Sequence, residues 1–205
     1  NLFWLANIYN NLGVFYQLTG EYLEAYDAFI DGLKFARASG YARMEAFILT
    51  GIGDVFTDLQ IDDQAMQAFY MAEVIADRTQ EHFLQVYLKI QRALLSGYHN
   101  EFNTGFDLLQ QALEQIGPNG SAMERNLVNL EFAGLQILQK KGHLNLSTLE
   151  KTSSFFESGG HKVQFEKAHL YLAIAYILNH QFEKVIVHLL HIFSCLEGEY
   201  FPAAL

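Results

Sequence analysis

The sequence has no possible internal disulfide, no surplus of basic residues and no long apolar run. Its one cysteine, Cys195, excludes an internal disulfide and fits a reducing cytoplasm, where we expect the protein. The 13 Lys and Arg are outnumbered by 23 Asp and Glu, and the net charge of −10 opposes direct contact with nucleic acid or an anionic membrane. The longest apolar run, 170–178, is roughly half a membrane span, so we expect no transmembrane segment.

Signatures of cofactor binding and catalysis are also missing. Gly51 and Gly53 could open a dinucleotide fingerprint, but Phe56 stands where the third glycine belongs and no strand precedes them. No phosphate-binding G-x-x-x-x-G-K-[ST] loop occurs in the sequence. No Ser/His/Asp set can be assembled from spacing. We therefore expect no cofactor and no catalytic activity.

A metal site is weakly indicated and not expected. The candidate ligands near the C-terminal end are His180, His188, His191 and Cys195. No second cluster of matching spacing completes four ligands, and no C-x2-C or H-E-x-x-H pattern accompanies them. Glu166 and His169 have the Glu-x-x-His spacing of di-iron bundles, which need that motif twice. Packing of these side chains between helices is the simpler interpretation.

The chain does contain a repeat of 40 residues. Leu12-Gly13 recurs as Ile52-Gly53, and helix-breaking pairs fall on the same period, at Ser39-Gly40, Thr79-Gln80, Asn119-Gly120 and Gly159-Gly160. A fixed period of this length predicts a solenoid whose repeats stack on their neighbours. We expect a single array over 1–205, with repeats near 1–40, 41–80, 81–120, 121–160 and 161–200.

Each repeat has the apolar spacing of a helical hairpin. Leu5, Ile8, Tyr9 and Leu12 fall at i, i+3, i+4 and i+7, which places them on one helix face. Capping boxes at Ser121/Glu124 and Ser147/Glu150, and a longer turn around Gly142, mark helix boundaries in the fourth repeat. The sequence therefore predicts an all-α fold, a right-handed superhelix of about ten helices in five hairpins.

Small and large residues alternate at the places where helices are expected to cross. Gly13, Gly53 and Ala93 recur on the first helix of a repeat, where a larger side chain would push the helix axes apart. The second helix carries a large residue at one recurring position, occupied by Phe29, Phe69, Leu109 and Leu189. We expect the first three to fill the space between adjacent repeats. This alternation predicts closely interdigitated hairpins.

These residues resemble the tetratricopeptide repeat (TPR). The match in the first repeat comprises Asn11-Leu12-Gly13, Tyr16, Gly20, Tyr22, Ala25, Phe29 and Gly32; the second and fifth repeats match well, and the third and fourth weakly. Standard TPR repeats have about 34 residues. The 40-residue length and the stretch 165–173 resemble the sensor superhelix of STAND-type bacterial transcription regulators, the maltose-regulon activator and its LuxR-type relatives.

The resemblance implies a binding function on the concave face, which the first helices line. The side chains expected there are Asn7, Asn10, Gln17, Phe47, Thr50, Asp54, Asp58, Tyr87, Tyr98 and Glu131. Their mixed polar and aromatic character suits a protein or peptide partner or a small-molecule inducer. Asp54 and Asp58 are expected to form a solvated acidic stretch that contacts the partner.

Two functions follow from this resemblance. The first is a non-catalytic sensor module of a bacterial transcription regulator. Because the given sequence starts at Asn1 inside a helical pattern, we expect it to be a fragment of a longer protein. The alternative is a general TPR scaffold for protein assembly, unrelated to transcription. An enzyme is the weakest possibility.

Overall fold

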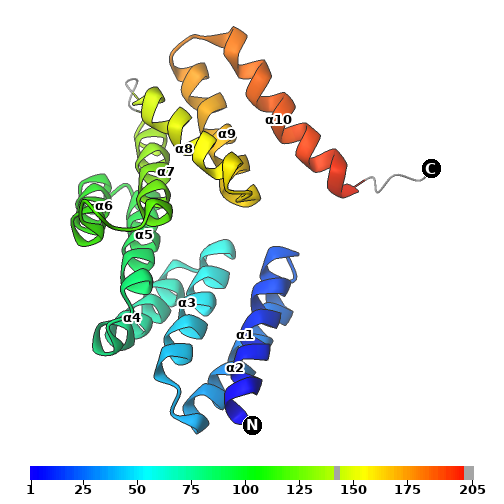
Figure 1. The fold of residues 1–205 in the computed structure, drawn as a ribbon, viewed down its shortest axis with the longest axis vertical. Coiled ribbons are helices and arrows are strands. Elements are labelled where there is room, and N and C mark those ends of the chain that lie inside the picture. The colour runs from blue at the N-terminus through cyan, green and yellow to red at the C-terminus, as the bar shows by residue number, and fades with distance from the viewer. Residues whose placement is uncertain (141–143, 201–205) are drawn as a thin grey trace. The chain divides into compact units, whose positions relative to one another are not determined.

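The computed structural model describes the backbone of residues 1–140 and 144–200 and the side chains of 1–140 and 144–193. The expected turn around Gly142 and the side chain of Cys195 lie outside these ranges. The described residues form ten α-helices, two for each repeat (Figure 1). They are α1 (Leu2–Leu18), α2 (Tyr22–Ser39), α3 (Ala42–Asp58), α4 (Asp62–Thr79), α5 (His82–Tyr98), α6 (Phe102–Ile116), α7 (Ala122–Leu138), α8 (Leu146–Ser158), α9 (Lys162–Leu178) and α10 (Phe182–Tyr200). The predicted all-α class is confirmed.

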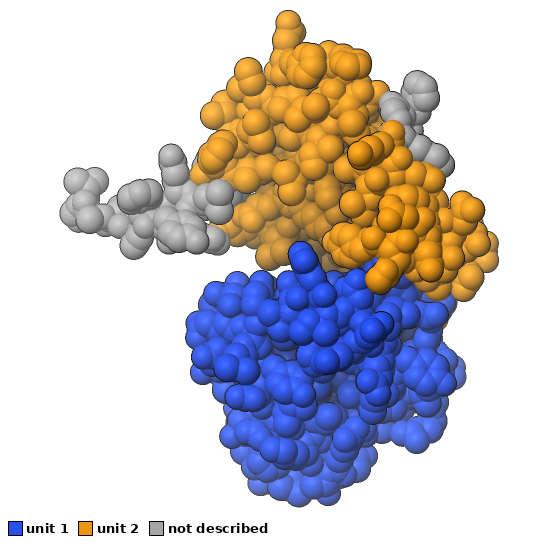
Figure 2. Space-filling model, turned by 180° about the vertical axis from the view of Figure 1, so that it is seen from behind, with its two compact units in different colours: residues 1–95 blue, residues 96–205 orange. Residues whose placement is uncertain are grey.

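The chain divides into two compact units, coloured separately in Figure 2. The N-terminal unit comprises Asn1–Leu95 and the C-terminal unit Ser96–Leu205. The division falls inside α5 and therefore inside the third repeat, and the single array over 1–205 stays a prediction. None of the helices formed by the described residues has the length and hydropathy that crossing a bilayer requires.

Glycine–phenylalanine contacts organise the core of the N-terminal unit. Phe29 and Phe69 are fully buried. A Cβ placed on Gly13 would lie 2.6 Å from the ring of Phe29, and one placed on Gly53 would overlap the ring of Phe69. The helices therefore approach so closely because these positions lack a side chain. The predicted alternation of small and large residues is confirmed here.

The C-terminal unit has a separate core, in which α7, α8 and α9 meet. Its buried members include Leu130 of α7, Phe156 of α8 and Tyr176 of α9. Leu109 is fully buried as predicted, but Leu189 is 38% exposed. Leu189 occupies the same repeat position on α10, the last helix that the structure describes.

The turns repeat with the same period as the helices. The turn inside a hairpin contains one residue with positive φ, and these residues are Gly20, Gln60, Asn100, Lys140 and His180. After this residue, the next backbone amide donates a hydrogen bond to the carbonyl five residues earlier and so ends the helix, as Glu21 N does to Tyr16 O. Glycine supplies this conformation only in the first repeat, so composition alone did not reveal the other turns.

The N-caps in the C-terminal unit match one of the two predicted capping boxes. Ser121 accepts a hydrogen bond from the Glu124 amide at 3.3 Å, as predicted. Helix α8, however, is capped by Asn145, whose side chain accepts from the Thr148 amide at 3.1 Å. The prediction at Ser147 was wrong, because asparagine caps as well as serine and stands two residues earlier.

Candidate functional site

Hydrogen bonds connect the first helices of three successive repeats in the N-terminal unit. The Gln17 side chain on α1 donates to Asp58 Oδ2 on α3 at 2.8 Å. The Tyr87 hydroxyl on α5 donates to Asp54 Oδ2 on α3 at 3.0 Å. Four of the predicted binding residues are thus brought together. We call this group, with Asn7, Asn10 and Phe47, the first-helix face.

Asp54 is not the solvated acid that the sequence analysis expected. Its Oδ1 is buried and has no hydrogen-bond partner among the described residues. Burial raises the pKa of Asp54 to about 8, the Tyr87 hydrogen bond opposes this shift, and the charge of Asp58 adds to it. The carboxyl group is therefore mostly protonated at neutral pH. The spacing of residues along α3 does not show this environment, because the hydroxyl that contacts Asp54 belongs to Tyr87, 33 residues away in the sequence.

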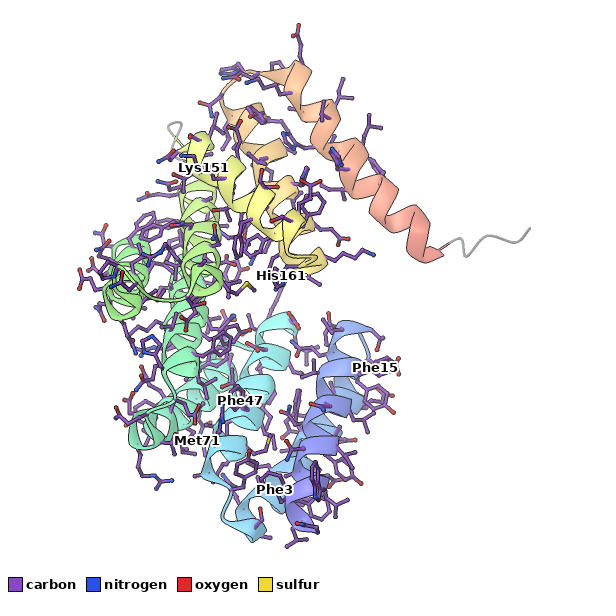
Figure 3. All side chains as sticks on the ribbon, in the orientation of Figure 1. Phe3, Phe15, Phe47, Met71, Lys151 and His161 are labelled. Atoms are coloured by element: carbon purple, nitrogen blue, oxygen red, sulfur yellow. The ribbon has the colours of Figure 1, made fainter. Side chains whose placement is uncertain are left out.

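Asp58 is the accessible acid of the first-helix face. It is exposed and is held in place by Gln17. Phe47, labelled in Figure 3, is half-buried against the core, and the Arg43 guanidinium lies 5.8 Å from its ring centroid. An exposed carboxylate such as Asp58 can bind a basic side chain of a partner.

The amide and hydroxyl side chains of this face differ in accessibility. Asn7 and Asn10 are half-buried, and Asn7 donates to the Phe3 carbonyl of its own helix at 2.8 Å. Thr50 is 4% exposed and donates to the Ala46 carbonyl at 2.9 Å. The prediction for Thr50 was therefore wrong: it faces the core and cannot reach a partner.

Glu131 is also buried, and its charge is already paired. Glu131 on α7 is 5% exposed, and its Oε1 lies 2.6 Å from Lys167 Nζ on α9. The Tyr171 hydroxyl approaches Glu131 Oε2 at 3.5 Å, and burial together with the Glu131 and Tyr98 charges raises the pKa of Tyr171. The prediction that Glu131 binds a partner was wrong, because Lys167 and Tyr171 enclose it. Tyr98 remains available, at 57% exposure.

The histidines of α9 and α10 form a packed cluster. The Nδ1 atoms of His169 and His188 lie 3.0 Å apart. Burial lowers the pKa of His169 to about 4, and the charges of His188 and His191 add to this. A pair of imidazoles this close holds at most one proton. The described residues contain no group of three or more His, Cys, Asp or Glu that could hold a metal ion.

A pocket of about 270 Å³ lies among α6, α7 and α8 in the C-terminal unit. Its lining combines four polar side chains with four apolar ones: Asn129, Gln136, Asn145, Thr148, Leu113, Phe132, Ala133 and Leu149. Sites for whole small ligands have about 300–1,000 Å³. This pocket is slightly smaller than that range. The sequence analysis missed it, since it forms in the weakly matching fourth repeat.

The comparisons with known proteins identify the fold. No protein-family model matches the sequence, and no curated protein matches it. The chain is similar to a crystal structure of TPR-like repeats from a Podosopora anserina protein described as a kinesin light chain. The TM-score is 0.60 at 12% identity, over 95% of this chain and 96% of that one. The TPR-like repeat fold is therefore confirmed.

Proposed function

We propose that this chain is a non-catalytic protein-binding scaffold whose first-helix face binds a basic peptide segment of a partner. The observation that carries this proposal is the pair of bonds Gln17–Asp58 and Tyr87–Asp54. Together they hold polar side chains from three successive repeats in one row. Such a row matches an extended peptide, whose groups also recur at short intervals.

Charge supports a basic partner. The net charge of −10 attracts a basic segment over a long range and raises its association rate at low salt. Asp58 offers an exposed carboxylate, whereas Asp54 is protonated near neutral pH and contributes no charge. Asp58 is therefore the main electrostatic contact of the face. A small-molecule inducer, the other predicted ligand, has no comparable support.

The narrower hypothesis is that the module is the sensor of a bacterial transcription regulator. It rests on the 40-residue repeat and on the resemblance of residues 165–173. The encoding gene tests it directly. A nucleotide-binding domain before Asn1 and a helix-turn-helix domain after Leu205 would support the regulator hypothesis. If the gene encodes neither domain, the alternative of a general scaffold for protein assembly is favoured.

A displayed peptide library tests the binding proposal. Selection on the purified chain should enrich peptides with Lys or Arg, and their affinity should fall as salt rises. Asp58→Lys should weaken the selected peptides at least about tenfold at low salt, because like charges then meet. Asp27→Lys is the matched control, since Asp27 is an exposed acid on a second helix.

The control separates a local contact from the effect of total charge. Both variants change the net charge equally, so an equal loss of affinity in both would contradict the proposed face. Enrichment of acidic or purely apolar peptides would contradict the proposed partner chemistry.

A further inference from the structure

The pocket among α6, α7 and α8 lies where other repeats place aromatic rings of their own. Counted in steps of 40 residues along the sequence, the pocket residue Gln136 corresponds to Tyr16, Phe56, Ser96 and Tyr176. Tyr16 and Phe56 pack against the core of the N-terminal unit, and Tyr176 is buried in the C-terminal unit. The fourth repeat therefore has an amide side chain where three of the other four repeats have a ring.

A second pocket position also lacks its ring. Leu149 on α8 corresponds to Phe29 and Phe69, which are both fully buried. Leu149 and Gln136 both line the pocket. Two positions that hold rings in the first two repeats thus hold an aliphatic and an amide side chain here, and a space of about 270 Å³ is left between the helices.

Two amide side chains of this pocket have unused hydrogen-bonding capacity. Asn129 and Gln136 on α7 are half-buried, and no hydrogen bond joins either side chain to another described residue. Each amide provides N–H donors and a carbonyl acceptor. A bound group that pairs with them satisfies polar atoms that the fold leaves unpaired.

The remaining lining favours an uncharged ring. Phe132 of α7 stacks on Phe106 of α6 with ring centroids 6.0 Å apart, which holds one aromatic wall in place. None of the described residues that line the pocket is charged, so an ionised ligand would lose hydration without gaining a counter-charge. Since a cavity of about 150 Å³ already accommodates benzene, this pocket has room for a ring with a polar substituent.

We propose that this pocket binds an uncharged aromatic ring that carries a hydroxyl group, a phenol. The ring takes the space that Tyr16 and Phe56 fill in their own repeats, and its hydroxyl pairs with Asn129 or Gln136. Two sources present this chemistry: the tyrosine side chain of a partner protein and a free phenol. The site lies wholly in the C-terminal unit and does not depend on the first-helix face of the N-terminal unit.

An NMR titration of the isotope-labelled chain with p-cresol, which is the tyrosine side chain without its backbone, tests this proposal. The side-chain amide signals of Asn129 and Gln136 should move and saturate, with a dissociation constant on the order of 1 mM for so small a ligand. Toluene lacks the hydroxyl and should bind about fivefold more weakly, because one hydrogen bond is lost. The charged p-toluate ion should show no measurable binding.

Two variants test the position of the ligand. Gln136→Phe restores the ring that Phe56 supplies in the second repeat, so it should weaken p-cresol binding at least about tenfold without lowering the melting temperature. Asn129→Leu introduces the residue found at Leu49 and removes one amide, so toluene should then bind better than p-cresol. Gln110→Phe, at an exposed amide of α6, adds the same ring outside the pocket and should bind p-cresol like the wild type.

The same titration with N-acetyltyrosine amide identifies the source of the ring. Binding equal to that of p-cresol would support a partner's tyrosine, and binding of p-cresol alone would support a free phenol. No movement of the Asn129 and Gln136 signals with either probe would overturn the proposal. Equal binding of toluene and p-cresol to the wild type, or undiminished binding to Gln136→Phe, would overturn it as well.

Discussion

The two compact units neutralise a buried acid on their first helices in different ways. In the N-terminal unit, Asp54 accepts a hydrogen bond from the Tyr87 hydroxyl, and burial raises its pKa to about 8. In the C-terminal unit, Glu131 meets the Lys167 ammonium at 2.6 Å. A proton removes the charge of the first acid, and a counter-ion offsets the charge of the second.

This difference has consequences for stability and for binding. A group neutralised by a proton responds to pH, whereas an acid paired with lysine depends on the presence of its partner. The N-terminal unit also keeps its free charge at Asp58, on the surface. The proposed peptide contact therefore belongs to the N-terminal unit, and the Glu131 network is a structural feature of the other.

The largest expected effect concerns one repeat position that is buried in the N-terminal unit and partly exposed on α10 of the C-terminal unit. Phe29→Ala and Phe69→Ala should each lower the free energy of unfolding by about 3–5 kcal/mol, because both rings are fully buried. Leu189→Ala, at the same position of α10, should cost less than about 1 kcal/mol, since Leu189 is 38% exposed. Chemical denaturation measures all three, and similar costs would show that the repeat register is misassigned.

Removing the counter-ion should destabilise the C-terminal unit. Lys167→Met keeps most of the side-chain volume but leaves the Glu131 carboxylate buried without its cation. We expect a loss of about 2–3 kcal/mol, less than for a fully buried pair because Lys167 is partly exposed. The double variant Lys167→Met/Glu131→Gln should recover part of it. No recovery would mean that lysine packing, and not charge, is what matters.

Asp54→Asn should raise the stability of the N-terminal unit, whereas Lys167→Met lowers that of the C-terminal unit. The folded pKa of Asp54, about 8, exceeds the ordinary 3.8, so the unfolded chain releases this proton first. Wild-type stability therefore falls as pH rises from about 4 to about 8 and then levels off. Asparagine carries no charge and can still accept from Tyr87, so the variant should be more stable at pH 8 by about 1–2 kcal/mol.

Thermal unfolding of wild type and Asp54→Asn at pH 6 and pH 8.5 measures this difference. The gap between the two proteins should widen at the higher pH. A gap that shrinks would show that Asp54 is charged and stabilised in the folded state.

The histidine pair should make the C-terminal unit sensitive to acid. The folded pKa of His169, about 4, lies below the ordinary 6.5, so the unfolded chain gains a proton first as pH falls. Stability should decline between about pH 6.5 and pH 4, by about 1 kcal/mol after allowance for solvent screening. His169→Gln should show a shallower decline in denaturant titrations over this range. If stability falls equally steeply with pH in the wild type and in His169→Gln, the histidine pair is not the cause of the acid sensitivity.

The smallest expected effect concerns a turn. Gln60 has φ of 59°, a conformation that costs about 1–2 kcal/mol for a residue with a side chain. Gln60→Gly removes this cost but adds freedom to the unfolded chain, so a net gain of about 0.5–1 kcal/mol is expected. Gly20→Ala, at φ of 81° in the equivalent turn, should lose a similar amount. Calorimetry resolves both, and the same sign for the two would contradict the turn periodicity.

Much of the fold could be predicted from the sequence, because helical hairpins are local. Gly13, Gly53 and Phe29 repeat at fixed spacing, and their close contacts follow from residue size alone. Boundaries such as Ser39–Gly40 could also be predicted, since glycine favours the left-handed conformation found at Gly40.

The sites could not be predicted in the same way. The surroundings of Asp54 include a tyrosine hydroxyl 33 residues away in the sequence, and those of Glu131 include a lysine 36 residues away. A helical wheel places both acids on the side facing away from the core, but it does not show what the next repeat brings over them. The binding face therefore stays a prediction for Gln17 and Asp58, which are linked across repeats, whereas the burial of Thr50 and Glu131 contradicts it for those two residues.

The protonation of Asp54 is the claim on which the comparison of the two units depends most. Its carboxyl carbon can be followed by NMR in protein labelled at aspartate, with Asp54→Asn to assign the signal. The account predicts a titration midpoint near pH 8, which should change when Tyr87→Phe removes the hydrogen bond. A midpoint near pH 4 would show that Asp54 is an ordinary solvated acid and would contradict the account.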